Sequence, residues 1–164
     1  MSATSNPEPS ASEPVLPELG HVVLFVSDLE RSTAFYGGVL GWRSIPRPDG
    51  MPACAFSSGR THHELLLIEV GPDAEPIPSG RRVGMYHFGV KIGDHDDDLR
   101  AMRDRLAEFP DLVRLVGQSD HGVTHSLYVE DPDGNEVELY VDVPDVDWRN
   151  DPSLFNQPVR PLDL

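Results

Sequence analysis

Hydrophobic and polar positions along the first half of the chain predict a strand, a helix and three further strands. The apolar run GHVVLFV (20–26) is typical of a buried strand. Apolar residues then recur at helical spacing as far as Gly41, and we expect Ser27 to cap this helix, with Glu30 completing a capping box. Three short runs with strand-like composition follow, at 42–46, 53–58 and 64–70.

The second half of the chain repeats this order. The apolar run YHFGVKI (86–92) predicts a strand, and a helical pattern across 95–109 ends at Pro110. Further strands are predicted at 112–116, 125–130 and 136–142. A curled sheet of this kind cannot bury its concave face alone, so two such modules are expected to lie side by side. The predicted fold class is α+β, with two βαβββ modules forming a curled mixed sheet around a shared cleft.

The two ends of the chain differ in composition from its middle. The first residues are rich in Ser, Pro and Glu and poor in large apolar groups, which predicts a disordered leader. The last residues hold several prolines around Trp148 and Phe155, and we expect them to lie extended rather than form a regular element. The predicted segments are a leader at 1–17, a single domain at 18–143 with modules at about 18–72 and 84–143, and a tail at 144–164.

Charge and cysteine content narrow the classes of protein that fit. The net charge of −15 argues against a nucleic-acid partner, because proteins that bind phosphate backbones present clustered Lys and Arg. It equally disfavours an anionic membrane surface. The single cysteine, Cys54, excludes an intrachain disulfide and a zinc site of several thiolates. The sequence has neither a signal-peptide pattern nor an apolar run of membrane-spanning length, and it predicts a cytoplasmic protein.

Polar side chains interrupt the apolar strands at matching places in the two modules. Aligning the modules by their opening strands sets His21 opposite His87. Aligning them by the glycines of their last turns sets His63 opposite Glu138. A carboxylate that faces a core is costly unless something compensates it, so the charge of Glu138 needs a partner in the cleft. Two histidines and one carboxylate form the facial triad of non-haem Fe(II) oxygenases, and zinc, manganese or nickel also suits such ligands.

Simpler explanations exist for these polar residues when each is taken alone. A lone histidine in an apolar strand, such as His21, is more often a satisfied core residue than a metal ligand. Glu136 is predicted to face solvent, and the acids around His95 suit the positive end of a helix dipole. What favours a metal site is the coincidence of His21, His87 and Glu138 in corresponding strands of a repeat.

Four motifs carry the strongest signal for function. They are His21 in GHVVLFV, the pair His62-His63 in THHELLL, His87 in YHFGV and the run SDHGVTHSLYVEDPDGNEVELY. In that run Tyr128 precedes Glu138 by ten positions. With these motifs the chain resembles the vicinal oxygen chelate (glyoxalase/bleomycin resistance/dioxygenase) superfamily across about residues 18–143. Within it, the chain is most similar to the type I extradiol ring-cleavage dioxygenases, in the compact form with one pair of modules.

The resemblance implies an Fe(II)-dependent extradiol dioxygenase that cleaves a catechol-like aromatic ring with O2. It assigns the metal to His21, His87 and Glu138, with Mn(II) or another divalent ion as an alternative to Fe(II). The metal would bind both catechol oxygens and O2 and lower the pKa of the bound hydroxyl. The resemblance gives His63 the part of acid and base, which suits a histidine. It gives Tyr128 a hydrogen bond to a substrate oxygen.

One position departs from the pattern of that family. The family commonly has a histidine nine positions before the Tyr, and here that position is Ser119. His121 is the candidate to occupy the same space if the loop is shorter, and we count it among the catalytic residues. The expected partners are a small catecholic substrate, O2 and further copies of the chain in a homo-oligomer, with neither nucleic acid nor membrane.

Two other functions of the superfamily remain open. A glyoxalase-like lyase or isomerase would use a metal as Lewis acid on a small carbonyl compound, and it generally wants a carboxylate where His63 sits. Glu64 is adjacent, but it should point to the opposite face of its strand. A metal-free drug-binding resistance protein would not need His21, His87 and Glu138 together. We therefore rank the dioxygenase first, the lyase second and the binding protein third.

Overall fold

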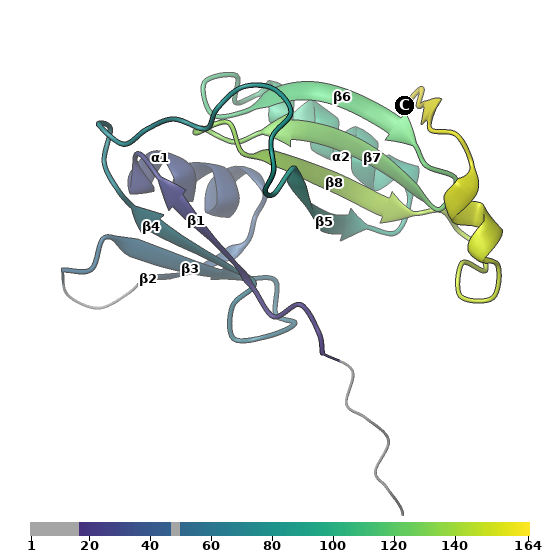
Figure 1. Ribbon diagram of the computed structural model, residues 1–164, viewed down its shortest axis with the longest axis horizontal. Coiled ribbons are helices and arrows are strands. Elements are labelled where there is room, and N and C mark those ends of the chain that lie inside the picture. Colours follow the sequence, from purple (N-terminus) through teal and green to yellow (C-terminus); the bar gives the residue numbers. More distant parts are fainter. Residues whose placement is uncertain (1–16, 47–49) are drawn as a thin grey trace, which may run out of the picture.

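The first half of the chain forms a four-stranded mixed sheet, in a computed structural model that describes residues 17–46 and 50–164 (Figure 1). Its strands are β1 (Val22–Val26), β2 (Arg43–Pro46), β3 (Ala53–Ser57) and β4 (Leu65–Glu69). Their order in the sheet is β1-β4-β3-β2, in which β1 and β4 run parallel and the other neighbours antiparallel. The four strands predicted for this half are therefore present.

The second half forms a sheet of its own with the same core topology. Its strands are β5 (His87–Gly93), β6 (Arg114–Asp120), β7 (Thr124–Glu130), β8 (Glu136–Asp142) and the short β9 (Arg160–Pro161). Their order is β5-β8-β7-β6-β9, and β5 runs parallel to β8 as β1 does to β4. The predicted α+β fold of two βαβββ modules is confirmed, with one mixed sheet in each module.

The first helix begins later than the sequence pattern suggested. α1 (Leu29–Thr33) is capped by Asp28, whose carboxylate accepts a hydrogen bond from a backbone N–H of the first turn at 2.9 Å. The predicted capping box at Ser27 is therefore wrong, and the Ser27 hydroxyl donates instead to Asp133 of the other module. The helix continues as a wider π-helical segment, η1 (Ala34–Val39).

A single hydrophobic core connects the two modules. In the second module α2 (Asp96–Ala107) buries Leu99 and Leu106. In the first, the alternation of side chains along β1 directs Leu24 and Val26 into the same core. The other buried members of this core are Phe35, Tyr36, Val39, Cys54, Phe56, Leu65, Leu67, Val90, Val113, Leu127, Val129, Val137, Leu139 and Val141. The helix-bearing side of the first sheet therefore packs towards the second module.

Polar contacts that Ser27 and η1 make with the Asp-Pro-Asp-Gly turn fix this junction. The Tyr36 hydroxyl donates a hydrogen bond to Asp131 Oδ2 at 2.8 Å, and the Ser27 backbone N–H donates to Asp133 Oδ2 at 3.1 Å. Burial raises the pKa of the Asp131 carboxyl, although hydrogen bonds from Asn135 and Tyr36 oppose the shift. The turn thus docks the first helix in addition to joining β7 to β8.

The opposite faces of the two sheets are open and differ in polarity. On the first sheet Val23 and Phe25 point away from the core and are 45% and 69% exposed. Beside them lies a small apolar cluster of Ala53, Ala55, Leu66 and the partly buried Ile68. The open face of the second sheet carries mainly acidic, histidine and tyrosine side chains. Within one chain, one open face is therefore apolar and the other polar.

The two ends of the chain were predicted to lack regular structure. The leader lies, apart from Pro17, outside the described residues. The tail differs from its prediction, because it contains a 3-10 helix, η2 (Pro152–Asn156), and the strand β9, which pairs with β6. Within residues 17–46 and 50–164, no helix is long and apolar enough to cross a membrane.

Candidate metal and substrate site

The open face of the second sheet carries a row of polar side chains on β8. The apolar residues of this strand are buried, and its even-numbered residues lie on the other face, partly exposed. These are Glu136, Glu138, Tyr140 and Asp142. The neighbouring strands and their ends add His87, Ser126, Tyr128 and His121. Together these residues form the candidate site.

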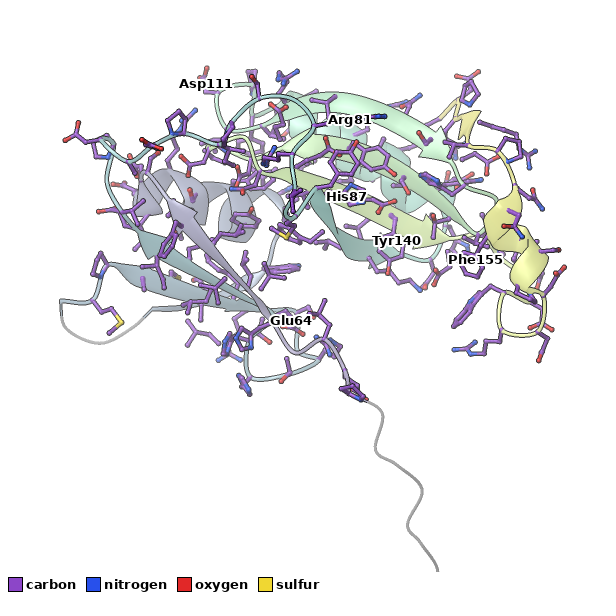
Figure 2. All side chains as sticks on the ribbon, viewed as in Figure 1. Glu64, Arg81, His87, Asp111, Tyr140 and Phe155 are labelled. Atoms are coloured by element: carbon purple, nitrogen blue, oxygen red, sulfur yellow. The ribbon has the colours of Figure 1, made fainter. Side chains whose placement is uncertain are left out.

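His87 lies between two carboxylates of β8 (Figure 2 labels His87 above this sheet). Its Nδ1 is 3.4 Å from Glu136 Oε1, and its Nε2 is 3.3 Å from Glu138 Oε2. The parallel pairing of β5 with β8 accounts for this position, because it sets His87 in register with Glu136. The Nδ1 of His87 and the Oε1 of Glu136 are buried and have no hydrogen-bond partner among the described residues. A small rotation of the imidazole would bring these two atoms within hydrogen-bond distance and leave Nε2 directed at Glu138.

Hydroxyl groups hold the second oxygen of Glu138. Ser126 Oγ donates to Glu138 Oε1 at 2.7 Å, and the Tyr128 hydroxyl donates to the same atom at 3.1 Å. Burial, followed by the negative charge of Glu138, raises the pKa of Tyr128 well above its usual range, so this phenol stays protonated. Glu138 Oε2 accepts neither of these hydrogen bonds and is directed at His87. It is therefore the oxygen that an ion bound beside His87 would contact.

His121 completes the polar network from the end of β6. Its Nε2 is 2.7 Å from the Tyr128 hydroxyl and 4.0 Å from Glu138 Oε1. Ser119, two residues earlier, pairs with Ser126 within the sheet. His121 is therefore within hydrogen-bond distance of Tyr128, and its catalytic role stays a prediction.

Sequence reasoning missed several residues of this site, and two of them, Glu136 and Gly89, bear directly on His87 and Glu138. The prediction that Glu136 faces solvent is wrong, since it shares a face with Glu138 and one of its oxygens is buried next to His87. The two-residue period of a strand was the signal that could have found it. Gly89 is the second: a Cβ there would lie 3.2 Å from the Tyr140 ring and 3.6 Å from Glu138 Oε2. Glycine leaves room for both side chains.

The first module brings three histidines together beside the start of β1. The ring centroids of His21 and His63 are 4.5 Å apart, and those of His62 and His63 are 4.4 Å apart. The Nδ1 atoms of His62 and His63 lie 2.5 Å apart, within hydrogen-bond distance. His21 and His62 are exposed and His63 is half-buried. The structure therefore places His63 next to His21.

The strand register corrects the alignment of the last strands of the two modules. The pairs that define it are Val22 with Leu65 in the first sheet and Phe88 with Val137 in the second. Val22 and Phe88 each come one residue after an aligned histidine, so their partners Leu65 and Val137 are equivalent. The next residues along these strands, Leu66 and Glu138, are then equivalent too. The alignment of His63 with Glu138 is therefore wrong. The loop before β4 is longer than the turn before β8, so matching the turn glycines shifts the register.

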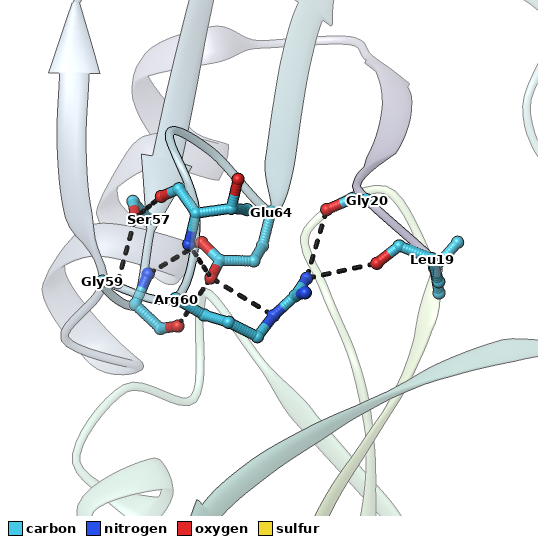
Figure 3. A network of polar contacts seen from close by, with 8 residues as sticks. Leu19, Gly20, Ser57, Gly59, Arg60 and Glu64 are labelled. Atoms are coloured by element: carbon cyan, nitrogen blue, oxygen red, sulfur yellow. Dashed lines mark hydrogen bonds and ion pairs between the residues drawn. The ribbon is translucent and has the colours of Figure 1, made fainter. Parts of the chain in front are cut away.

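The carboxylate of Glu64 forms hydrogen bonds and an ion pair within its own loop (Figure 3). Its carboxylate accepts hydrogen bonds from the Ser58 backbone N–H at 3.0 Å and the Ser58 hydroxyl at 2.9 Å, and it forms an ion pair with Arg60. The Arg60 guanidinium in turn donates to the carbonyl oxygens of Leu19 and Gly20 at 3.3 and 3.2 Å. Glu64 thus orders the segment that leads into the His21 strand.

The predicted metal ligands lie at two separate places in the chain. The structure brings His87 together with Glu138, and it brings His21 together with His63, but the two pairs belong to different modules. Across residues 17–46 and 50–164, no group of three or more His, Cys, Asp or Glu side chains is arranged to hold a metal ion. The triad of His21, His87 and Glu138 therefore stays a prediction, and one chain on its own supplies two of its members at one place and the third, His21, at another.

Comparison with known proteins identifies the family to which this chain belongs. The family model described as the Glyoxalase/Bleomycin resistance protein/Dioxygenase superfamily matches residues 18–139. Among solved structures, a glyoxylase/bleomycin resistance protein/dioxygenase domain from Frankia sp. EAN1pec has a TM-score of 0.63 and 21% identity, covering 79% of this chain and 100% of that one. The chain belongs to this superfamily.

The relatives with named activities include both dioxygenases and a lyase. Catechol-2,3-dioxygenase of Bacillus subtilis is 32% identical over 133 residues, which cover 81% of this chain and 44% of that protein. Biphenyl-2,3-diol 1,2-dioxygenase 3 of Rhodococcus globerulus is 35% identical over 133 residues, covering 78% of this chain and 65% of that protein. Lactoylglutathione lyase of Neisseria meningitidis is 32% identical over 124 residues, covering 73% and 86%. The chain thus spans less than two thirds of the length of either dioxygenase.

Proposed function

We propose that this protein is a metal-dependent extradiol dioxygenase that cleaves a catechol-like ring with O2. The observation that carries the proposal is the network on the second sheet, in which Tyr128 and His121 adjoin a carboxylate directed at the imidazole of His87. Similarity to two proteins named as dioxygenases of catecholic compounds supports it. The substrate would be a small aromatic diol.

The donors on the second sheet fit a divalent metal in type and spacing. His87 Nε2 and Glu138 Oε2 are 3.3 Å apart, close to the separation of two ligand atoms that are each about 2.1 Å from one ion. A carboxylate lies beside the other nitrogen of His87, as it commonly does for metal-bound histidines. Fe(II) is the metal we propose, with Mn(II) or another divalent ion as the alternative. Such an ion would bind the diol oxygens and activate O2.

We assign the third ligand, His21, to a second copy of the chain. Within one chain the modules meet through the helix side of the first sheet, which leaves the faces of His21 and Glu138 apart. The open face beside His21 exposes Val23 and Phe25, and an exposed apolar face of this kind suits burial between copies. A two-fold dimer would pair the first module of each copy with the second module of the other and form two equivalent sites.

The protein's own side chains would manage protons and substrate position. The protonated phenol of Tyr128 can donate a hydrogen bond to a substrate oxygen, and His121 next to it can accept a proton from a diol hydroxyl. Both atoms of O2 enter the ring-opened product, so the reaction consumes no reductant, and the protons taken from the diol are returned. His63, whose ring centroid lies 4.5 Å from that of the proposed ligand His21, would act as the acid and base for the oxygen.

A glyoxalase-like lyase is the second candidate, because a relative named lactoylglutathione lyase matches over most of its length. The first module argues against it. Leu66 stands at the place equivalent to Glu138 and has no oxygen to offer a metal, while the nearby carboxylate of Glu64 is held by Ser58 and Arg60. A metal-free binding protein would not need the network of His87, Glu138 and Tyr128.

The test is anaerobic purification with metal analysis, followed by parallel assays. Catechols would be screened for oxygen uptake and coloured ring-opened products, and the thiol adduct of an α-ketoaldehyde would be screened for isomerisation without oxygen. The proposal expects iron-dependent oxygen uptake with a catechol. Isomerisation of the thiol adduct in the absence of oxygen uptake would assign the protein to the lyases instead.

A further inference from the structure

A cavity of about 860 Å³ is formed by the connector between the two modules and by the turn between β7 and β8. Residues between 77 and 86 line it from the connector, and residues between 130 and 136 line it from the second sheet. Its volume falls within the range of about 300–1,000 Å³ that is typical of small-molecule sites. Glu136 is one of the lining residues, and the ring of Tyr86, another, has its centroid 4.6 Å from that of His87. The cavity therefore adjoins the candidate site.

A bend in the connector brings two adjacent arginines to this cavity. Gly80 has a φ of +84°, in the left-handed region that glycine adopts without strain, and it bends the chain. Across the bend, Arg82 Nη1 donates a hydrogen bond to the Pro78 carbonyl oxygen at 3.1 Å. Arg81 and Arg82 both line the cavity, and Figure 2 shows Arg81 on the connector above His87. The local structure of the connector thus positions two guanidinium groups at the cavity.

These two arginines lack a carboxylate partner within the described part of the chain. The described arginines that form an ion pair are Arg60, Arg100, Arg103, Arg114 and Arg160. Arg81 and Arg82 are not among them, although the chain has 28 acidic residues against 13 basic ones. With such an excess of acids, an ion pair within the chain would have been easy to provide. Two adjacent arginines without one suit a ligand that brings its own negative charge.

The acidic residues of the cavity lie against other groups of the chain. They are, with their neighbours, Glu130 beside Arg114, Asp133 beside Ser27 and Glu136 beside His87. Each carboxylate is thus directed at a donor outside the cavity or at its edge. The guanidinium groups of Arg81 and Arg82 are therefore the charged groups that remain to contact a ligand.

Apolar side chains of the connector lie next to the arginines. Ile77, Met85 and Tyr86 line the same cavity. Met85 is 45% and Tyr86 74% exposed, so both offer apolar surface to a ligand. A cation beside exposed apolar surface suits a molecule that has one anionic group and an apolar body.

We propose that this cavity binds a small organic acid, with its carboxylate on Arg81 and Arg82 and its apolar body against Met85 and Tyr86. A guanidinium presents parallel N–H donors that match the two oxygens of a carboxylate. The proposal goes beyond the proposed function and does not depend on it, because neither arginine belongs to the proposed metal site. The carboxylate is either a substituent of the diol or part of a separate acid, and the same contacts serve both.

Titration of the metal-free protein tests the cavity without catalysis. Backbone amide resonances would be followed while benzoate, benzamide or acetate is added. Benzamide has the shape of benzoate without its charge, and acetate has the charge without the ring. We expect saturable shifts between residues 77 and 86 with benzoate at a Kd of about 1 mM, and at least about tenfold weaker binding of the other two. Absence of saturable shifts there, or equal binding of benzamide, would overturn the proposal. Equal binding of acetate would overturn the apolar contacts.

Matched variants assign the binding to the arginine pair. Arg81→Gln should weaken the binding of benzoate about tenfold, and Arg81→Lys, which keeps the charge but not the paired donors, should restore part of it. Arg43→Gln is the control, because Arg43 is an exposed arginine of β2 that does not line this cavity. It should keep the affinity of the wild type. Equal losses in Arg81→Gln and Arg43→Gln would show an effect of net charge alone and overturn the site.

Assays of the metal-loaded protein distinguish the two sources of the carboxylate. If it is a substituent of the diol, benzoate competes with catechol, and 3,4-dihydroxybenzoate has a lower KM than catechol, an advantage that Arg81→Gln removes. If it belongs to a separate acid, benzoate binds equally well with catechol present. Binding of benzoate without cleavage of any diol would support the cavity and contradict the dioxygenase. Cleavage of catechol by a protein that does not bind benzoate would support the dioxygenase and overturn the cavity.

Discussion

The two modules share one topology but differ at the position with the greatest chemical consequence. His21 and His87 hold equivalent places at the start of their first strands, whereas Leu66 stands where the second module has Glu138. The second module joins its carboxylate to an imidazole and two hydroxyls. The first module joins His21 to His63 and leaves an apolar face around them.

This difference shows that the two modules share the residue pattern that determines the fold but not the polar residues of the open faces. The positions that face the core alternate in the same way in both sheets, because each sheet must bury one side against helix and core. The positions on the open faces carry no such constraint, and they differ between the modules. In the proposed function the second module provides most of the site for metal and substrate, and the first would contribute a histidine pair and an apolar surface.

The largest expected effect is on metal content, and it distinguishes Glu138 from Leu66, its equivalent in the first module. Glu138→Ala should lose most of the bound metal, because it removes the only carboxylate of the proposed ligand set. Leu66→Met, at the equivalent place in the first module, keeps volume and polarity and should keep full metal content. Metal analysis of the two purified proteins makes the comparison. If both variants retain stoichiometric iron, Glu138 is not a ligand.

His63 should affect turnover without affecting metal content. His63→Asn removes the proposed acid and base, so turnover should fall by about two orders of magnitude or more while iron is retained. His95→Asn is the control, because His95 is an exposed histidine at the start of α2, on the other module. Steady-state oxygen uptake and iron content are measured on both. Unchanged turnover in His63→Asn would contradict the proposed role, and loss of iron would make His63 a ligand.

Glu136 should act through His87. Removing it in Glu136→Ala should weaken metal affinity roughly 10- to 100-fold, since the carboxylate no longer fixes the imidazole that binds the metal. Glu136→Gln keeps an acceptor oxygen and should restore part of the affinity. Glu130→Gln, on the neighbouring strand and paired with Arg114, serves as control. Competition with a metal chelator measures all three, and equal affinities of Glu136→Ala and wild type would show that Glu136 has no positioning role.

The smallest effect concerns the junction between the modules. Tyr36→Phe removes the hydrogen bond to Asp131 and should lower the free energy of unfolding by about 1–2 kcal/mol. Asp131 keeps its other donors, including the Asn135 amide at 3.0 Å, so the fold should persist. Tyr86→Phe, an exposed tyrosine, should change stability by no more than about 0.5 kcal/mol. Urea denaturation of both variants measures the difference, and equal midpoints would mean that the junction rests on apolar packing alone.

Sequence periodicity predicted most of the elements because strands such as β1 and β8 alternate between a buried and an open face. It also identified His87 and Glu138, which belong to adjacent strands of one sheet. The equivalence of Leu66 with Glu138 escaped it, because loop lengths differ between the modules and only hydrogen-bond register fixes the match. The 3-10 helix η2 and the two-residue strand β9 of the tail escaped it as well, since such short elements leave no periodic signal.

The central claim is that each metal site combines His87 and Glu138 of one copy with His21 of another. Complementation between two defective chains tests it: His21→Ala and Glu138→Ala, co-expressed with different affinity tags. Each variant alone should lack metal, and random dimers of the two should regain roughly a quarter of the wild-type metal, because half the dimers carry one intact site. Purification through both tags should enrich this fraction. Absence of metal in the doubly purified dimer, or stoichiometric metal in His21→Ala alone, would contradict the shared site.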